Sequence, residues 1–395
     1  GYAGLFGIYI LLAYSYLSNI VIAHTEIHNS VIHFVGIVLF ILSIKRKYFE
    51  YKKEIIFTLI VFALIFCALL QFKNHDDFSY YHLPYTYYLT QQSLYIGVGD
   101  FNHGFRTPSS IFYLNSLFYL PVAKFYLLNF SSIFILGFAN IALLKKIHHY
   151  FRFSNTTKKD VNVVNFLSLF SFIFINIFFY RLSEYGTDRA AMILIFLFII
   201  ELLRFTYIQK IESSDLFHIY FLGAIIVSLK AFYILYLIFV IPLFICVIKK
   251  KIFYIKSFNF LFINRYCVIF LVLLFFVLET SFINTGCLVY PISFTCFDNL
   301  DWNIPLRIVE QMNNWYELWS KGGAAPNFRA ENPGEYIKGF NWVNNWMDIY
   351  FFNKISDYIL GVVTLIIIVL FFFRKEFFNY KLAKIDKHIY LVYLT

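Results

Sequence analysis

Long, nearly uninterrupted apolar runs are the feature that most constrains what this chain can fold into. A helix that crosses about 30 Å of hydrocarbon needs about 17–25 mostly apolar residues, and the sequence repeats such runs from end to end. We predict an all-α fold, a polytopic helical membrane protein with about ten to eleven transmembrane helices. The predicted spans are 2–22, 27–44, 55–72, 122–144, 163–180, 190–207, 216–229, 231–248, 266–283 and 357–373, and a last run starts at 388.

The composition excludes the ordinary soluble classes. Hydrophobic types make up 60% of the 395 residues and charged types 14%, against about 45–50% and about 25% in soluble domains. Disordered chains, which are poor in aromatic residues, are excluded as well. The sequence has no phosphate-binding Gly-rich loop, dinucleotide fingerprint, zinc-protease motif or hydrolase elbow, so neither ATP-driven transport nor protease chemistry of those kinds is expected.

Basic residues collect in alternate loops and so orient the chain. The segments 45–54, 145–160, 249–265 and 374–387 each hold five Lys or Arg residues. Loops rich in Lys and Arg stay in the cytoplasm, which explains the net charge of +10 without a nucleic-acid partner. A specific site for anionic lipid is the alternative role of these loops. We expect a multi-pass protein of the bacterial inner membrane whose active face lies outside the cytoplasm.

Acidic residues favour the other face, where we place any chemistry. Fourteen of the 23 acidic residues lie in its loops, which are expected to carry short amphipathic helices. Glu201 precedes Arg204 by three residues near a cytoplasmic end and is expected to pair with it within one helix. Three parts are predicted: a transmembrane domain at 1–283 with outer loop 73–121, an extracytoplasmic segment at 284–356, and a C-terminal transmembrane part at 357–395 that we expect to be truncated.

The first outer loop opens with two adjacent carboxylates, Asp76 and Asp77, close to the membrane edge. Ionisable groups beside apolar spans are costly unless they are used. We interpret the pair as catalytic carboxylates or as ligands of a divalent cation such as Mg²⁺ or Mn²⁺; solvated loop residues are the alternative. His82, His103 and Arg106 follow in the same loop and are candidate substrate-binding residues.

A second group of charges lies at other outer helix ends. Asp188 and Arg189 begin a predicted span, where an acid complements the helix dipole or simply caps the helix. Asp188 is the third candidate catalytic carboxylate. Lys230 lies between two apolar runs. It either extends to water without further role, or joins Arg106 and Arg189 in neutralising a lipid phosphate.

Tryptophan and cysteine mark the segment 284–356. All five tryptophans lie in it, and the pairs Trp315/Trp319 and Trp342/Trp346 each share a helix face by their i, i+4 spacing. The pairs are expected to anchor helices in the headgroup region, with stacking on sugar rings as the alternative.

Cysteines divide by compartment. Cys287 and Cys296 lie outside the membrane in an oxidising space and are expected to form a disulfide. Cys67, Cys246 and Cys267 fall in or beside spans and are expected to act as small apolar residues.

The layout of 55–283 resembles the GT-C superfamily of integral membrane glycosyltransferases, which use polyprenyl-phosphate-linked sugars. The shared features are a long outer loop that opens with paired acids, here Asp76-Asp77, many short-looped spans, and a second outer loop with an acid and a base, here Asp188-Arg189. The resemblance implies transfer of a sugar from a polyprenyl-phosphate donor to a glycan or lipid acceptor on the extracytoplasmic face.

The resemblance also implies roles for single residues. Asp76 or Asp77 would be the general base or a metal ligand, and Arg106, Arg189 and Lys230 would hold the donor phosphate. Two other classes remain open: a transporter or flippase of lipid-linked saccharides, and a polymerase or ligase of such saccharides.

Overall fold

The computed structural model describes residues 1–66, 77–153, 161–179, 187–207, 212–239, 241, 243, 245, 248, 259–325 and 328–372. Every regular element among them is a helix, and extended pairing is limited to two isolated bridges. The prediction of an all-α fold is confirmed for this part of the chain. Two compact units are formed, and each is described by itself. In the described residues, unit 1 comprises 1–95 and 108–277, and unit 2 comprises 96–107 and 278–372.

The helices of unit 1 include several that follow predicted apolar runs within a few residues, because runs without Gly or Pro interruptions favour continuous helix, and others that lie in the predicted outer loop 73–121. They are α1 (Tyr2–Val21), α2 (Glu26–Ile65), α3 (Leu83–Gln91), α4 (Ser110–Ser116), α5 (Phe130–Phe153), α6 (Val161–Phe178), α7 (Thr187–Tyr207) and α8 (Phe217–Leu229). A π-helical turn (Phe78–His82) precedes α3, a 3-10 segment (Ala231–Phe239) follows α8, and α11 (Cys267–Thr285) runs from unit 1 into unit 2.

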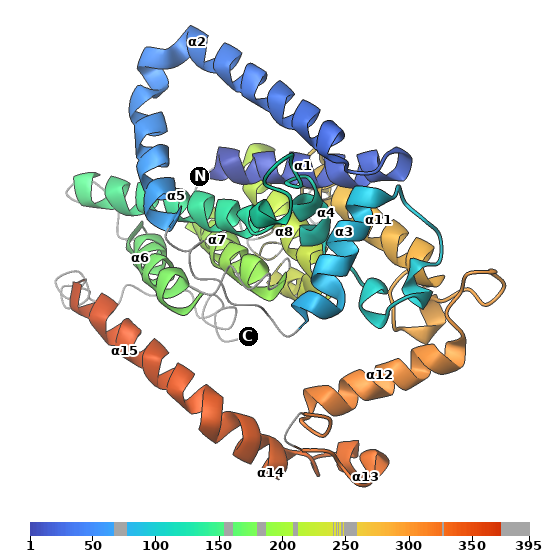
Figure 1. The fold of residues 1–395 in the computed structure, drawn as a ribbon. Coiled ribbons are helices and arrows are strands. Elements are labelled where there is room, and N and C mark those ends of the chain that lie inside the picture. Colours follow the sequence, from blue (N-terminus) through green and yellow to red (C-terminus); the bar gives the residue numbers. More distant parts are fainter. Residues whose placement is uncertain are drawn as a thin grey trace. The chain divides into compact units, whose positions relative to one another are not determined.

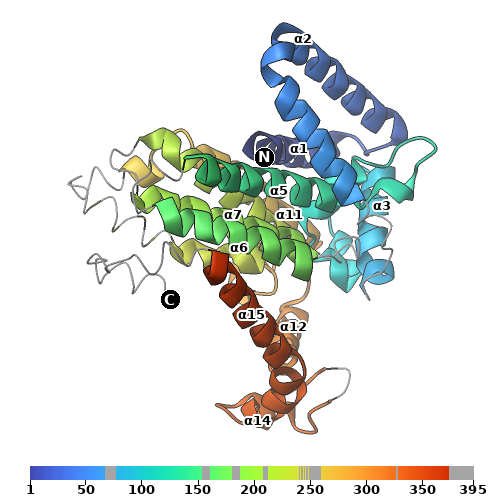
Figure 2. The ribbon, with the colours of Figure 1, turned by 90° about the vertical axis from the view of Figure 1, so that its left-hand side faces the viewer.

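Helices α7 and α8 form the centre of unit 1. Helix α7 packs against α5, α6 and α8, and Figure 2 shows α5, α6 and α7 side by side. Leu194 and Leu197 of α7 and Phe221 of α8 are 0% exposed. Helix α8 is apolar on all sides, which is typical of a helix buried within a bundle.

Helix α2 differs from the sequence prediction at 45–54. We expected a loop between two spans, whereas the structure continues one helix through this segment from Glu26 to Ile65. Figure 1 shows α2 bending into two arms. The segment KRKYFEYKKE lacks Gly and Pro and is rich in Lys, Arg and Glu, which are good helix formers. The helix therefore continues through this segment into the second arm.

Among the described residues, five helical segments are long and apolar enough to cross a membrane. They are Tyr2–Val21, Glu26–Lys45, Phe125–His148, Cys267–Thr285 and Val343–Phe371, and the shorter apolar segments are Val163–Phe178 and Ser213–Leu229. By length and composition the chain is thus a membrane protein. The total of ten to eleven spans and their orientation stay predictions.

Helix α1 approaches α5 closely at Gly4, which leads to a testable prediction. A Cβ on Gly4 would lie 2.3 Å from the ring of Phe138, and that ring already packs edge-on against Phe62 at 5.2 Å. Gly4→Leu is expected to lower the free energy of unfolding by about 1–3 kcal/mol through overpacking. Gly7→Leu on the same helix is the control, because no described atom lies within 4 Å of that position. Thermal unfolding in detergent measures both; equal melting temperatures would contradict this packing.

Unit 2 contains a disulfide-closed hairpin that packs against the start of its first long helix. Its helices are α12 (Leu306–Ser320), α13 (Pro333–Ile337), α14 (Val343–Trp346) and α15 (Ser356–Phe372), with a π-helical segment (Met347–Ile355) before α15. Cys287 and Cys296 are joined by a disulfide and are also paired by an isolated bridge. Cys287 is buried in a small core with Tyr290, Ile304 and Val309, so this core fixes the disulfide hairpin against the start of α12.

The tryptophan pairs of unit 2 lie as their spacing predicts. The rings of Trp315 and Trp319 on α12 stack with centroids 5.4 Å apart. The rings of Trp342 and Trp346 meet edge to face at 6.2 Å. Trp315 and Trp319 are 39% and 40% exposed, so this pair presents an apolar surface outward.

Candidate functional site

The described part of the predicted first outer loop begins at Asp77, which precedes the π-helical turn as its N-cap. The carbonyl oxygen of Asp77 accepts hydrogen bonds from the backbone N–H groups of Tyr81 and His82. Its carboxylate Oδ2 accepts a hydrogen bond from the Tyr81 hydroxyl at 3.2 Å. Asp77 is half-buried. Asp76, the other predicted carboxylate, lies outside the described residues.

The aromatic side chains after Asp77 connect this turn to α4. The ring of Phe112 lies 6.2 Å from that of Tyr81 and 5.2 Å from that of His82. His82 is 2% exposed and packs edge-on against Tyr81 at 4.4 Å. The imidazole of His82 thus lies beneath the turn rather than in an open cleft. Its predicted role in substrate binding stays a prediction.

The N-terminus of α4 reaches the end of α8 through three serines. Ser109 caps α4 and donates its hydroxyl to the carbonyl oxygen of Leu229 at 2.5 Å. Ser110 and Ser228 exchange a hydroxyl hydrogen bond at 2.9 Å, and all three serines are buried. Helix α4 therefore ties the turn that carries Asp77 to the residue that precedes Lys230.

Lys230 and Asp188 meet in the structure. The Lys230 Nζ lies 2.5 Å from Oδ1 of Asp188, and their side chains are 46% and 42% exposed. Asp188 lies in the first turn of α7, next to the half-buried Arg189. An exposed ion pair contributes only about 0–1 kcal/mol to stability. The structure thus brings together two predicted site residues, and their ion pair contributes little to the stability of the fold.

His103 and Arg106 belong to unit 2, where each has an identified partner. Arg106 donates from Nε to the carbonyl oxygen of Gly99 at 3.1 Å and from NH1 to the Tyr290 hydroxyl at 2.8 Å. Burial raises the pKa of Tyr290, and the neighbouring guanidinium opposes that rise. His103 Nε2 lies 3.2 Å from the Tyr316 hydroxyl. Both residues hold their loop to other parts of unit 2, and their binding roles stay predictions.

A buried charge cluster around Glu201 was predicted only in part. The pairing with Arg204 is confirmed, with Nε 2.7 Å from Oε2. Lys146 Nζ also lies 2.8 Å from Oε1, the Tyr2 hydroxyl donates to Oε1 at 2.6 Å, and His218 Nδ1 lies 3.5 Å from Oε2. Glu201 is 1% exposed. No local spacing could have indicated the three partners from other helices.

His24, between α1 and α2, is a second buried titratable group that sequence patterns did not single out. Its Nδ1 lies 2.6 Å from the Ser116 hydroxyl and its Nε2 2.9 Å from the Ser18 hydroxyl. His24 is 0% exposed. Burial, with a smaller contribution from the neighbouring His28, lowers the pKa of His24 to about 3. The imidazole is neutral at physiological pH and joins α1 to the end of α4.

The depressed pKa of His24 predicts loss of stability in acid. An unfolded His takes up a proton near pH 6.5, whereas the folded one resists it down to about pH 3. The contribution is therefore complete above pH 6.5 and is lost as pH falls through that window. At pH 5 the loss is about 2 kcal/mol relative to pH 7.5. Thermal unfolding against pH should show this fall, and His24→Gln should weaken it; identical pH profiles would contradict the assignment.

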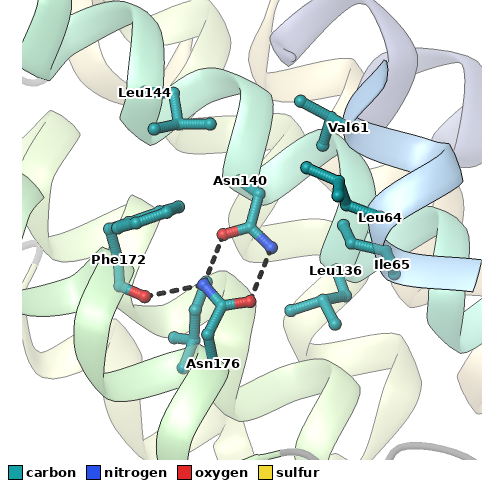
Figure 3. Close-up of a pocket in the computed structure, with 9 residues that line it drawn as sticks. Val61, Leu64, Ile65, Leu136, Asn140, Leu144, Phe172 and Asn176 are labelled. Carbon is teal, nitrogen blue, oxygen red and sulfur yellow. Dashed lines mark hydrogen bonds between the residues drawn. The ribbon is translucent and has the colours of Figure 1, made fainter. Parts of the chain in front are cut away.

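An apolar cavity of about 290 Å³ opens between α2, α5 and α6. Figure 3 shows the side chains of Asn140 and Asn176 in direct contact, with their amides exchanging hydrogen bonds at 3.0 and 2.7 Å. The remaining lining residues are Val61, Leu64, Ile65, Leu136, Leu144, Phe172 and Ile175. The walls suit a hydrocarbon chain, and the amide pair satisfies the polar groups within them.

A metal centre was predicted at Asp76 and Asp77. Across the described ranges, no group of three or more His, Cys, Asp or Glu side chains is arranged to hold a metal ion. Of the predicted pair, the structure describes only Asp77, one ligand where hard divalent cations take several oxygens. These residues alone do not make a site, and the role of a divalent cation stays a prediction.

Comparisons with known proteins identify the family of the chain. No curated protein and no solved structure matches it. The model of one family, described as domain of unknown function (DUF8201), matches residues 2–395. That match extends over nearly the whole chain, and the protein therefore belongs to this family.

Proposed function

We propose that the protein is a membrane glycosyltransferase of the GT-C type, which moves a sugar from a polyprenyl-phosphate donor to an acceptor on the extracytoplasmic face. The observation that carries the proposal is the contact between Lys230 and Asp188, 2.5 Å apart at the ends of α8 and α7. Helix α4, which packs beside the turn that follows Asp77, is hydrogen-bonded to the end of α8 next to Lys230. An acid and a cation with solvent access therefore stand on elements packed together in unit 1.

The proposed reaction is a direct displacement at the anomeric carbon. The Asp77 carboxylate takes the proton of the acceptor hydroxyl as its oxygen forms a bond to that carbon. The bond between the anomeric carbon and the phosphate oxygen breaks, and its electron pair stays on the phosphate. Lys230 and Arg189 stabilise the charge that develops there. Displacement from the opposite side inverts the anomeric configuration.

The environment of the pair assigns Asp188 a positioning role in this scheme. Its carboxylate holds the Lys230 ammonium by the ion pair, and the Asp77 carboxylate accepts a hydrogen bond from the Tyr81 hydroxyl. The scheme therefore uses Asp188 to hold Lys230 and Asp77 as the general base. A divalent cation at Asp76 and Asp77 would supply further charge stabilisation, and no step above depends on it.

A transporter or flippase for lipid-linked saccharide is the first alternative. Transporters place ionisable groups and broken helices near the bilayer midplane and are built from repeated halves. No repeat is evident in the sequence, and the charged pair lies at helix ends, so these observations favour the enzyme. A polymerase or ligase is the second alternative and would depend on outer-loop Arg and His residues such as Arg106 and His103.

Purified protein in proteoliposomes, supplied with polyprenyl-phosphate monosaccharides and an extract of acceptor glycolipids, tests the proposal. A labelled sugar that appears in the acceptor supports the glycosyltransferase. Movement of intact donor between leaflets without a new glycosidic bond would support the flippase and contradict the proposal. Joining of preassembled lipid-linked oligosaccharides without use of the monosaccharide donor would support the ligase instead. Lys230→Ala should lower transfer, while Lys321→Ala in unit 2 is the control cation.

A further inference from the structure

Unit 2 contains a polar cleft that the reaction above does not use. It lies between the disulfide hairpin and the exposed side of α12 and has a volume of about 400 Å³. Its lining includes Pro291, Ser293, Phe294, Glu310, Asn313 and Asn314. A cleft of this size falls within the range of small-molecule sites, about 300–1,000 Å³.

The two walls of the cleft are held firmly in place. The disulfide closes the hairpin, and Leu288 N–H donates to the Thr295 carbonyl oxygen across it at 3.0 Å. The Thr295 hydroxyl donates to the Val289 carbonyl oxygen at 3.0 Å. On the other wall, Val309 is 0% exposed and packs into the same core as the hairpin. A ligand therefore meets a preformed surface, which reduces the entropy lost on binding.

The polar groups of α12 in the cleft are available to a ligand. Glu310, Asn313 and Asn314 are spaced i, i+3 and i+4, so they project from one face of the helix. All three side chains are exposed, and in the described part of the chain none makes a hydrogen bond or ion pair. Two amides offer donors and acceptors, and the carboxylate offers further acceptors. This combination matches the paired hydroxyls of a sugar ring.

An exposed aromatic ring completes the cleft. Phe294 is 87% exposed at the tip of the hairpin. Burial of its ring by a ligand would therefore be favourable, because apolar surface would leave water. The apolar C–H face of a sugar stacks on such a ring while its hydroxyls turn to the polar wall. No lining residue is cationic, and Glu310 is anionic, so the cleft disfavours phosphate and other anions.

We propose that this cleft binds a neutral saccharide, with its hydroxyls on Glu310, Asn313 and Asn314 and its ring on Phe294. Binding is independent of the transferase reaction. Only the further role of the bound saccharide as acceptor glycan rests on the proposed function. The expected affinity is weak, in the millimolar range, because one small polar cleft supplies few contacts.

Saturation-transfer NMR on the full chain in nanodiscs tests this proposal. The probes are neutral tetrasaccharides of glucose, mannose, galactose and N-acetylglucosamine. At least one should bind saturably, and Phe294→Ala and the double variant Asn313→Ala/Asn314→Ala should each weaken that binding at least tenfold. The matched controls are Phe340→Ala, which removes a ring of 84% exposure outside the cleft, and Gln311→Ala, which lies on α12 outside the lining. Both should bind as the parent protein does.

The outcomes separate this proposal from the proposed function. Binding without any transfer from a polyprenyl-phosphate donor would support the cleft and contradict the transferase. Normal sugar transfer without saturable binding of any tetrasaccharide would overturn the saccharide-binding proposal and leave the proposed function standing. Unchanged binding in both Phe294→Ala and Asn313→Ala/Asn314→Ala would also overturn the saccharide-binding proposal. Melting temperatures and an intact Cys287–Cys296 disulfide, checked by mass under non-reducing conditions, show that each variant is folded.

Discussion

Asp77→Asn is expected to lower kcat/KM for sugar transfer at least 100-fold. Loss of a general base costs about 10²–10⁴ in rate, because the acceptor hydroxyl then has no group to take its proton. The substitution keeps the shape of the side chain, and the amide oxygen still accepts the Tyr81 hydroxyl that now bonds Oδ2 at 3.2 Å. The melting temperature should therefore change little. Initial rates with a labelled lipid-phosphate sugar measure the loss, and KM should change much less than kcat.

Matched variants decide whether the effect belongs to this carboxylate. Asp298→Asn removes an exposed outer-segment carboxylate and should retain parent activity. Asp76→Asn tests the neighbour of Asp77 and should reveal which member of the pair acts as base. Full activity in both Asp76→Asn and Asp77→Asn would remove the catalytic assignment from the pair.

Glu201→Ala is expected to be the most destabilising substitution in unit 1. It removes the carboxylate that now lies 2.8 Å from the Lys146 nitrogen and 2.7 Å from Arg204 Nε, and leaves Arg204 with Asp215, whose Oδ1 lies 3.7 Å from NH1. Breaking a buried ion pair by removing one partner costs about 3–5 kcal/mol. Glu201 is 1% exposed and its removal takes an ionic partner from both cations, so a loss within that range is expected. Thermal unfolding and the yield of monodisperse protein measure the loss.

The control for Glu201 is the ion pair of Lys145 with Glu54. These side chains are 45% and 51% exposed, and such a pair contributes about 0–1 kcal/mol. Glu54→Ala should therefore leave the melting temperature nearly unchanged. A similar loss in both variants would show that burial does not set the strength of the Glu201 cluster.

The helices were predictable because their signal is local. Apolar runs determine the bounds of α6, α7, α8 and α11 within a few residues, since each run buries its backbone polar groups in its own helix. The basic segment 45–54 was predicted as a loop by its charge. Charge decides which side of the membrane a segment occupies, whereas helix propensity decides whether the helix continues, and here the two differ.

The sequence could predict a contact in the candidate site only where the order and direction of the helices determine it. Asp188 begins α7 and Lys230 follows α8, so two successive antiparallel helices bring them to the same end. The burial of His82 depends on Phe112 of α4, and the capture of Lys146 by Glu201 depends on the packing of α5 with α7. Contacts of this kind arise from tertiary packing and leave no spacing signal in the sequence.

Cross-linking in intact cells tests the central claim most directly. The double variant Asp188→Cys/Lys230→Cys is made in a background with Cys67, Cys246 and Cys267 replaced by Ala. A membrane-impermeant bis-maleimide with a short spacer is then added from outside. If the two helix ends meet on the extracytoplasmic face, the reagent joins α7 to α8 in sealed cells, and a proteolytic cut between them no longer separates the fragments. Cross-linking only after the membrane is permeabilised, or none at all, would contradict the proposed site.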